Sequence, residues 1–263
     1  MHDPAHQCLL DRLRRLGSAA VAFSGGADSG LLLALTRDAC KGRVLALTSV
    51  APYMARQEIS EAVAFTTGLG VRHELIELPM PQSMEDNPPD RCYLCKRALY
   101  EQITAAAVRL GFTAVLDGTN LDDLKDYRPG LRAVRELGIL TPLLDCLVAK
   151  ADVRRISHAL GLSSWRKPTN ACLLTRLPFG QRVSMPTLQR IEEAERVLLA
   201  EGFDWVRVRL HGTLARIEVA RDQRGRLLEQ SDAVVSALKA LGFHHVTLDL
   251  EGYRLGSMNE PLV

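Results

Sequence analysis

Residues 19–35 of the chain are AAVAFSGGADSGLLLAL, and this stretch decides the fold. The apolar run at 19–23 predicts a buried strand, and the leucine-rich run at 30–35 predicts a helix. Between them, Gly25 and Gly26 let the backbone come close to a ligand. The first turn of the helix offers free N–H groups and the positive end of the helix dipole, which favour a phosphate. The stretch therefore predicts a phosphate-binding loop between a strand and a helix.

Three side chains add polar groups to this loop. Ser24 and Ser29 can donate hydroxyl hydrogen bonds, and Asp28 could hold a magnesium ion that bridges phosphate oxygens. No lysine follows Gly26, and the glycine spacing is that of neither a Walker A loop nor a Rossmann fingerprint. A tight turn capped by serine would explain a bare glycine pair. The agreement of strand, turn and helix favours phosphate binding instead.

The hexapeptide SGGADS at 24–29 closely resembles the SGGxDS signature of the PP-loop ATP pyrophosphatases. That superfamily includes NAD synthetase, the ATPase domain of GMP synthetase, tRNA thiolation enzymes and the LarE sulfur transferases. The resemblance implies an enzyme that splits ATP between its α- and β-phosphates, adenylates a substrate and releases pyrophosphate. The loop alone does not identify the substrate.

Length and composition set the class of protein. The 263 residues could form one large or two modest domains, and 47% hydrophobic and 24% charged residues are ordinary globular values. A formal charge of +2 gives no argument for nucleic acid. We see no signal-peptide pattern and no apolar stretch near the ~20 residues that span a bilayer. We therefore expect a cytoplasmic protein with no membrane or nucleic-acid partner, whose six cysteines are reduced.

Strand and helix patterns alternate in the first part of the chain. This βαβα order predicts an α/β fold, a parallel twisted sheet with helices on both faces. Ligands of such sheets bind beyond the carboxyl ends of the strands, where residues 24–29 lie. Strands are expected near Val21 and at 44–48, 71–78 and 114–116, and helices at 9–16, from 29, at 57–69 and at 91–110.

Two long connections follow, a proline-rich one at 79–90 and a second at 163–185. Loops of this length in a compact chain are usually functional or disordered, and the apolar and cysteine content of the second argues against disorder. Afterwards the pattern changes to that of a small α+β domain. Its expected elements are helices at 187–200 and 227–241, a hairpin of strands at 205–210 and 214–219, and a strand at 246–250. The expected domains are residues 1–182 and 183–263.

Cys92 and Cys95 open a predicted helix directly after the proline-rich connection. Two thiols at this spacing near a helix N-terminus have lowered pKa values and can bind a soft metal. A redox dithiol would follow the first strand of a thioredoxin-like unit, and four-cysteine zinc needs a second pair, which the chain lacks. A third cysteine would complete an iron–sulfur site with one open iron. Two unconnected structural cysteines, or an anion site beside the flanking basic residues, stay as alternatives.

Cys172 is the natural third ligand, because it lies in the long connection near Lys167 and Arg176, which would stabilise a thiolate. A cysteine between alanine and leucine could also simply be buried. The other three cysteines are expected to pack in the core: Cys8, Cys40 and Cys146.

At these residues the resemblance narrows to the LarE family, which makes the thiocarboxylates of the nickel-pincer nucleotide cofactor. KPTNACLLTRLPFG at 167–180 is similar to the family's sulfur-donor motif, with Cys172 at the donor position. RCYLCK at 91–96 resembles the cysteine pair of the subset that carries a 4Fe-4S cluster. The similarity covers nearly the whole chain. Further matching segments are DGTN at 117–120 with Asp122 and Asp123, DYRPG at 126–130, Arg207, Arg209, His211-Gly212, ARIE at 215–218 and GYR at 252–254.

The resemblance implies an ATP-dependent sulfur transferase acting on a small-molecule nucleotide. A carboxylate of pyridinium-3,5-biscarboxylic acid mononucleotide would be adenylated and converted to a thiocarboxylate. The resemblance also implies a homo-oligomer. It does not identify the source of the sulfide. The residues implied for ATP and magnesium are Ser24, Gly25, Gly26, Asp28, Ser29, Asp123 and Arg128.

Two routes for the sulfur follow from the resemblance. In cluster-free members of the family the donor cysteine is consumed, leaving dehydroalanine. This chain departs from them by having Cys92 and Cys95, which favours a 4Fe-4S cluster on these two thiols and Cys172. An extra sulfide on the open iron would then be the nucleophile, and Cys172 would be spared. Sacrifice of Cys172 is the alternative.

Arginines of the predicted hairpin are candidate substrate ligands. Arg207 and Arg209 alternate with valines and so face one side of the hairpin. They could bind the substrate's 5′-phosphate in the bidentate manner that suits arginine, or form a solvated face. Glu218 on the neighbouring strand could pair with them or contact the substrate. Arg176 and Arg254 are further expected substrate-binding residues.

Two other functions stay open. A tRNA thiolation enzyme would share the loop and a three-cysteine cluster, but it should carry a basic surface or an RNA-binding appendage. Acidic and basic residues are near balance after Gln181, which counts against it. A nucleotide- or iron-sensing module, which is no enzyme, would keep the loop but would not need the Cys172 segment.

Overall fold

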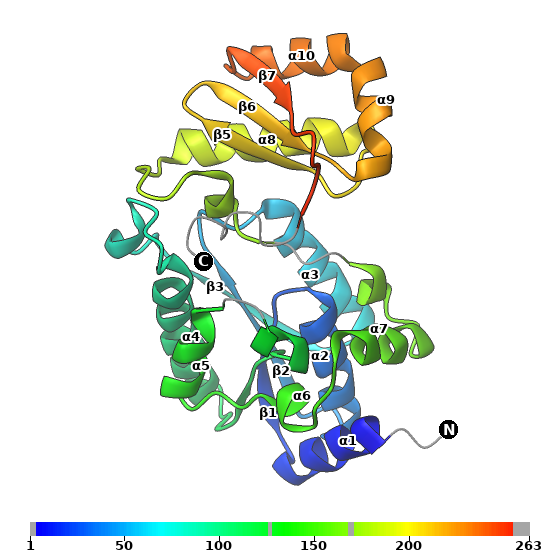
Figure 1. Cartoon of the computed structure of the whole chain (residues 1–263). Coiled ribbons are helices and arrows are strands. Elements are labelled where there is room, and N and C mark those ends of the chain that lie inside the picture. The colour runs from blue at the N-terminus through cyan, green and yellow to red at the C-terminus, as the bar shows by residue number, and fades with distance from the viewer. Residues whose placement is uncertain (1–3, 126–127, 168–170, 255–263) are drawn as a thin grey trace. The chain divides into compact units, whose positions relative to one another are not determined.

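The computed structural model describes residues 4–125, 128–167 and 171–254 and divides the chain into two compact units (Figure 1). The first unit comprises residues 1–81 and 90–170, and the second comprises 82–89 and 171–263. The division thus falls before residue 171, earlier than the expected boundary after residue 182. In the part of the chain that is described, no helix is both long and apolar enough for a membrane span.

A four-stranded parallel sheet lies at the centre of the first unit, in the order β3-β2-β1-β4. It confirms the predicted α/β class. β1 (Ala19–Ala22) pairs with β2 (Val44–Val50) on one side and with β4 (Val115–Leu116) on the other, and β3 (Arg72–Glu77) pairs with β2. Because all four strands are parallel, their carboxyl ends share one edge of the sheet, and the loop at 23–26 leaves β1 there.

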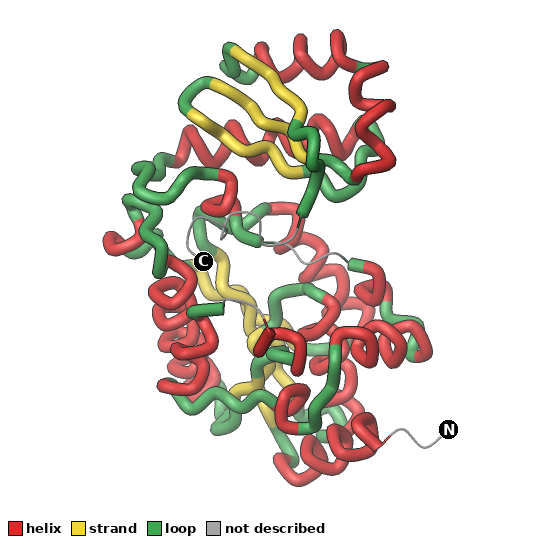
Figure 2. Tube along the Cα trace, viewed as in Figure 1, coloured by secondary structure: helices red, strands yellow, loops and turns green. Residues whose placement is uncertain are grey.

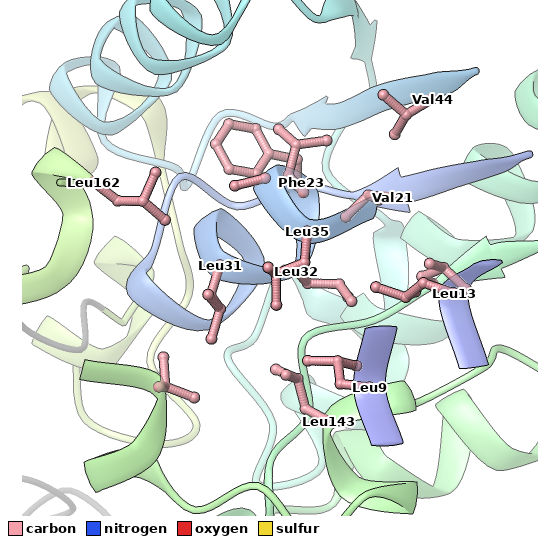
Figure 3. Packing of buried hydrophobic residues seen from close by; sticks show 14 of the residues in the cluster. Leu9, Leu13, Val21, Phe23, Leu31, Leu32, Leu35, Val44, Leu143 and Leu162 are labelled. Carbon is pink, nitrogen blue, oxygen red and sulfur yellow. The ribbon is translucent and has the colours of Figure 1, made fainter. Parts of the chain in front are cut away.

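One face of this sheet packs on the larger hydrophobic core. Val21 and Val44 contribute to it from the sheet, and Leu32 contributes from α2 (Ala27–Ala39) (Figure 3). Burial removes apolar surface from water, which is the main favourable term in folding. The same core takes in residues of α1 (Pro4–Leu16), α3 (Arg56–Leu69), α6 (Pro142–Asp145) and α7 (Lys150–Ala159).

The other face packs on a second core. Here Ala20 and Leu45 meet Ile103 of α4 (Arg91–Arg109), and α5 (Gly130–Glu136) adds Val134. Neighbouring residues of one strand point to opposite faces, which is why Ala20 and Val21 serve different cores. The first unit is therefore a sheet between two layers of helices, as predicted.

The helix after the phosphate loop is buried on nearly every side. Ala27 and all residues from Ser29 to Thr36 are buried, which explains why the sequence of α2 has no polar face. The loop at its N-terminus therefore starts from a well-packed helix.

The second unit contains a small mixed sheet, which confirms the predicted α+β class for this part. β5 (Arg207–His211) and β6 (Leu214–Glu218) form the predicted antiparallel hairpin, and β7 (His245–Leu248) adds in parallel to β6 (Figure 2). α8 (Met185–Ala200) begins after Ser184, whose hydroxyl accepts a hydrogen bond from the backbone N–H of Thr187 at 3.3 Å.

The prediction of a single helix at 227–241 is wrong. Two helices occupy this part, α9 (Arg224–Glu229) and α10 (Ser231–Ala240). Between them the backbone of Gln230 leaves helical geometry, with φ −99° and ψ 15°, so α9 ends there. No glycine or proline marks Gln230 in the sequence, which is why apolar periodicity missed the break.

The proline-rich connection is an ordered part of the second unit, although its neighbours in sequence belong to the first. The side-chain amide of the fully buried Asn87 donates to the carbonyls of Leu174, Leu177 and Pro178 at 2.9 to 3.2 Å. These bonds join residues 82–89 to the segment after residue 171. They also explain why residues 171–182 belong to the same unit as α8, although the expected boundary after residue 182 would separate them.

Candidate active site

The loop after β1 combines a left-handed glycine, two neighbouring hydroxyls and a helix N-terminus without a side-chain cap. Gly25 has φ +73°, in the left-handed region that favours glycine, and a Cβ there would lie 3.0 Å from the Cβ of Ala62. The hydroxyls of Ser24 and Ser29 lie 3.0 Å apart, and the Ser24 hydroxyl accepts from the N–H of Gly26 at 3.4 Å. No side chain caps α2 in the described structure, so its first-turn N–H groups are available to an anion.

Asp28, the predicted magnesium ligand, lies at the N-terminus of α2 beside two donors. Lys150 Nζ is 2.5 Å from its Oδ2, and Asn120 Nδ2 donates to its Oδ1 at 3.1 Å. Nothing in the sequence marks Lys150, because no local pattern connects it with a residue 122 positions earlier. The backbone N–H of Lys150 also donates to Asp122 at 2.8 Å, which fixes the start of α7 next to the loop.

A second carboxylate, Asp123, is electrostatically coupled to Asp28. Asp123 accepts from the N–H of Asn120 at 2.9 Å and pairs with Arg128 at 2.8 Å. Burial raises the pKa of Asp123, and repulsion from Asp28 raises it further. Asn120, Arg128 and Lys150 oppose this rise. A divalent cation would relieve the repulsion, and carboxylates are the ligands that Mg²⁺ prefers, so the residues present fit a magnesium ion.

The acidic segment after β4 is held by a buried network. Asp117 accepts from the hydroxyl of Tyr100, and Lys96 Nζ lies 3.2 Å from the same carboxylate. Burial opposes ionisation of Asp117, but the charge of Lys96 and hydrogen bonds from Thr119 and Tyr100 lower its pKa. The ionised carboxylate thus fixes the chain that leads to Asn120 and the two acidic residues above.

The cysteines predicted to bind iron are divided between the two units. Cys92 is exposed and Cys95 partly buried, three residues apart on one face of α4 in the first unit. The Sγ of Cys95 lies 3.3 Å from the hydroxyl oxygen of Tyr53. Cys172, partly buried, belongs to the second unit. Within the described parts of each unit, no three metal-binding side chains lie together. None of these three cysteines forms a disulfide, and three thiolates as a donor set fit an iron–sulfur cluster.

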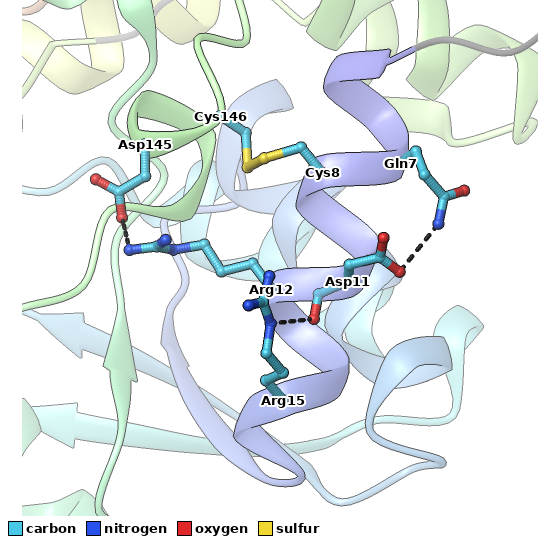
Figure 4. The surroundings of a disulfide bond; sticks show 7 residues. All are labelled: Gln7, Cys8, Asp11, Arg12, Arg15, Asp145 and Cys146. Atoms are coloured by element: carbon cyan, nitrogen blue, oxygen red, sulfur yellow. Dashed lines mark hydrogen bonds and ion pairs between the residues drawn. A yellow bond between two sulfur atoms is a disulfide. The ribbon is translucent and has the colours of Figure 1, made fainter.

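One expectation for the cysteines is wrong. Cys8 and Cys146 are not reduced but form a disulfide, and Cys8 is exposed, whereas Cys146 packs in the core as predicted (Figure 4). The bond arises because α1 and α6 share a core, which brings two residues 138 positions apart to a Cα separation of 5.9 Å. Cys40 is buried, as predicted, and burial raises the pKa of its thiol.

Both predicted arginines of β5 are buried, so the solvated-face alternative is wrong. Arg209 donates through Nε and Nη2 to the two oxygens of Glu218 at 2.8 and 2.9 Å, and through Nη1 to the carbonyl of Thr175 at 2.5 Å. Glu218 is therefore the partner of Arg209. Such bidentate pairs are strong and fixed in orientation.

Arg176 holds the backbone around Cys172. It donates to both oxygens of Glu195 at 2.8 and 2.9 Å, and its Nη1 donates to the carbonyls of Ala171 and Cys172 at 2.6 and 3.1 Å. Sequence analysis missed Glu195, which lies among the buried residues of α8. A glutamate on the apolar face of an amphipathic helix is the signal that could have found it.

Arg207 lies in a positively charged setting. Its guanidinium carbon is 5.1 Å from the centre of the Tyr253 ring. Burial lowers the pKa of Arg207, and the charges of Arg176 and Arg209 lower it further. Glu195 and Tyr253 act in the opposite direction. A bound anion would stabilise these three guanidinium groups, which suits a phosphate.

The remaining predicted residues have partners elsewhere. Arg254 binds Glu251 at 2.5 Å, and its side chain is partly exposed. Lys167 binds Glu61 of α3 at 2.6 Å, within the first unit. Parts of two quoted motifs, residues 126–127 and 168–170, lie outside the described residues.

Comparison with known proteins adds three relatives, while no family model matches the chain. A pyridinium-3,5-bisthiocarboxylic acid mononucleotide synthase of Lactiplantibacillus plantarum is 35% identical over 97% of this chain and 93% of its own length. An uncharacterized protein of Synechocystis is 38% identical over 96% of this chain and 97% of its own length. A tRNA(Ile)-lysidine synthase of Salinispora arenicola is 30% identical over 61% of this chain and 53% of its own.

Proposed function

Because the chain belongs to the LarE family, that of pyridinium-3,5-bisthiocarboxylic acid mononucleotide synthase, we propose that it is an ATP-dependent sulfur transferase. Its substrate would be pyridinium-3,5-biscarboxylic acid mononucleotide, and its products a thiocarboxylate for the nickel-pincer nucleotide cofactor, AMP and pyrophosphate. One observation carries the proposal: the chain combines a phosphate loop with a partly buried Cys172 whose backbone carbonyl accepts a hydrogen bond from Arg176.

In the activation step, the phosphates of ATP bind the loop and the N-terminus of α2, with hydroxyls of Ser24 and Ser29 as donors. Lys150 adds a positive charge, and Asp28 with Asp123 would hold magnesium, which neutralises charge on the phosphates. An oxygen of the substrate carboxylate attacks the α-phosphate. The bond to the β-phosphate breaks, pyrophosphate leaves, and an acyl-adenylate forms.

In substrate binding, the 5′-phosphate of the pyridinium nucleotide would bind the arginine cluster of the second unit. Arg207 is the best candidate, since positive neighbours surround it. Arg176 and Arg209 contribute charge while Glu195 and Glu218 fix their orientation. An additional cation is available to the substrate on the partly exposed side chain of Arg254.

In the sulfur step, Cys92, Cys95 and Cys172 would hold a 4Fe-4S cluster, which when bound supplies an open iron for the sulfide that is transferred. The chain's own part is to keep the backbone of Cys172 in place through Thr175 and Arg176. The second candidate route is favoured by the partial exposure of Cys172. There its thiolate displaces AMP, and later loss of the Cα proton with cleavage of the Cβ–S bond leaves dehydroalanine and the thiocarboxylate.

The test is pyrophosphate release. The protein with ATP and Mg²⁺ should form pyrophosphate and AMP only when the pyridinium biscarboxylate nucleotide is present. Asp28→Asn should reduce the rate about a hundredfold or more, because the metal ligand is lost. Asp38→Asn is the matched control at the other end of α2, where an exposed Asp38 pairs with Arg37, and should retain the rate. If no pyridinium carboxylate causes pyrophosphate release, the proposal is contradicted.

The alternatives have their own outcomes in the same assay. Pyrophosphate release that depends on tRNA would identify a tRNA thiolation enzyme, and ATP binding without any turnover would identify a sensing module. We also propose that the protein is cytoplasmic and forms a homo-oligomer. Size-exclusion chromatography with light scattering tests the oligomeric state, because it measures the native mass.

A further inference from the structure

The disulfide Cys8–Cys146 lies close in sequence to Lys150, which contacts Asp28 beside the phosphate loop. Cys146 directly follows α6, and only Leu147, Val148 and Ala149 separate it from Lys150. Lys150 in turn contacts Asp28 at 2.5 Å. A covalent bond on the α1 side of the first unit is thus joined to the magnesium ligand by a very short piece of chain.

This piece of chain is ordered by its backbone, since the N–H groups of residues 147–150 donate in turn to Leu144, Leu143, Asp152 and Asp122. Leu147 has φ +54°, in the left-handed region, and its side chain is 67% exposed. Val148 is fully buried, donates its N–H to Leu143 and accepts from the N–H of Leu121, both at 2.9 Å. Because the piece is so short, a displacement of Cys146 reaches Lys150 directly.

The position of Cys146 depends on α1. The single turn of α6 is joined to α1 by the disulfide and by an ion pair between Arg12 and Asp145 at 2.6 Å (Figure 4). Apolar contacts of Leu143 add to these (Figure 3). The ion pair is partly exposed, with 48% and 32% of its side chains accessible, and such pairs contribute little. Once the disulfide is open, mainly the apolar contacts would hold α6 against α1.

We propose that Cys8–Cys146 is a reversible thiol–disulfide site that controls how firmly Lys150 is held at the phosphate loop, and thereby the affinity for ATP. The exposed Cys8 is the sulfur that an external thiolate can reach, whereas Cys146 is 6% exposed. Exposed disulfides are the labile and regulatory ones.

The exchange partner is a dithiol reductant. Its thiolate attacks the Sγ of Cys8, the S–S bond breaks, and Cys146 leaves as a thiolate that takes up a proton. The second thiol of the reductant then closes its own disulfide and releases Cys8. Two electrons pass to the protein. In the reverse direction a peroxide oxidises one thiolate to a sulfenic acid, which condenses with the other thiol and loses water.

The first experiment measures the bond and its effect on the chain without ATP. Peptide mass spectrometry should find Cys8 linked to Cys146, separated by a dithiol reductant and linked again by peroxide. Amide hydrogen exchange at residues 147–152 should be faster in the reduced protein. Cys8→Ser, a change at an exposed position, should exchange like the reduced protein in both conditions. Equal exchange in the oxidised and reduced states would overturn the proposal.

The second experiment measures ATP affinity by calorimetry and uses the proposed ATP site as its readout. Reduced protein and Cys8→Ser should bind ATP about fivefold or more weakly than oxidised protein. Equal affinities contradict the proposal, as does a redox effect that persists in Cys8→Ser, which would come from other thiols. If no state binds ATP, the proposed function fails, while hydrogen exchange still decides whether the disulfide orders residues 147–152.

Discussion

At the scale of single residues, Glu195 has the largest predictable effect on stability. Its pair with Arg176 is almost wholly buried, with 10% and 4% of the side chains exposed. Glu195→Gln leaves a buried guanidinium without its counter-charge, so we expect the free energy of unfolding to fall by about 3 kcal/mol. Urea unfolding measures this change.

The control for that variant lies on the same helix. Glu193 pairs with Arg196 at an exposed position, and Glu193→Gln should cost no more than about 1 kcal/mol. Equal effects of the two variants would contradict the buried pair. Because Arg176 also holds the carbonyl of Cys172, Glu195→Gln should in addition change the alkylation rate of Cys172, which Glu193→Gln should leave alone.

His73 predicts a pH dependence of stability. Its Nε2 lies 2.8 Å from the hydroxyl of Thr48, which donates to the carbonyl of Phe23, and its Nδ1 lies 3.0 Å from the hydroxyl of Thr66. This arrangement suits a neutral ring that donates through Nε2. Burial lowers the pKa of His73 from its usual 6.5, although Glu74 opposes this.

The sign follows from proton binding. Below pH 6.5 the unfolded chain binds a proton at His73 that the folded chain does not, so the free energy of unfolding falls as the pH falls. Above that range the contribution is complete. The difference in free energy between wild type and His73→Gln should therefore shrink from pH 8 to pH 5. Denaturant titrations at each pH measure it, and a constant difference would show that His73 is not shifted.

How far the site could be predicted is also decided residue by residue. Asp28 and Cys172 lie in local motifs, so the sequence shows them directly. Lys150 acts through a partner on another element, and no local pattern indicates it, whereas the place of Glu195 on the apolar face of α8 was a signal that could have been used. The alternation around Arg209 predicted a common face for the arginines but not that this face is buried, since period-two patterns do not distinguish a charged core from solvent.

At the scale of elements, the approach of β4 to α2 depends on one glycine. A Cβ at Gly118 would lie 2.9 Å from the backbone nitrogen of Ser29, and backbone atoms cannot move aside cheaply. Gly118→Ala should displace the start of α2, destabilise the protein by about 1–3 kcal/mol and weaken ATP binding. Thermal unfolding and calorimetry measure these effects.

A second glycine provides the matched control. Gly68 lies in α3, and a Cβ there meets nothing within 4 Å. Gly68→Ala should stabilise the protein by up to about 1 kcal/mol, because alanine is the better helix former. If Gly118→Ala is equally harmless, β4 and α2 do not need their close approach.

The elements themselves were largely predictable, because each buries one face or is buried wholly. Three of the four parallel strands follow from short apolar runs and β3 from its alternating pattern. The helices α5, α6 and α7 were not predicted, and two further features had no signal in the sequence. The break at Gln230 has no breaker residue, and the place of residues 82–89 in the second unit depends on Asn87 contacting carbonyls about ninety positions away.

At the scale of the whole molecule, the proposed chemistry is divided between two units. The phosphate loop, Asp28 and Lys150 belong to the first, and Cys172 with its arginines belongs to the second. Activation and sulfur delivery can therefore be impaired separately. Asp28→Asn should stop pyrophosphate release, while a change at Cys172 should leave release intact and stop thiocarboxylate formation.

The fate of Cys172 distinguishes the two sulfur routes. If Cys92, Cys95 and Cys172 hold a cluster, protein purified without oxygen should contain iron and sulfide, form more than one product per chain when sulfide is supplied, and keep its intact mass. Cys92→Ser should then lose iron and repeated turnover, whereas Cys40→Ala, at a buried thiol that is not among the proposed ligands, should keep both. Mass spectrometry after turnover decides the matter. Loss of the mass of hydrogen sulfide at Cys172, with one product per chain, would contradict the cluster route and establish sacrifice of the cysteine.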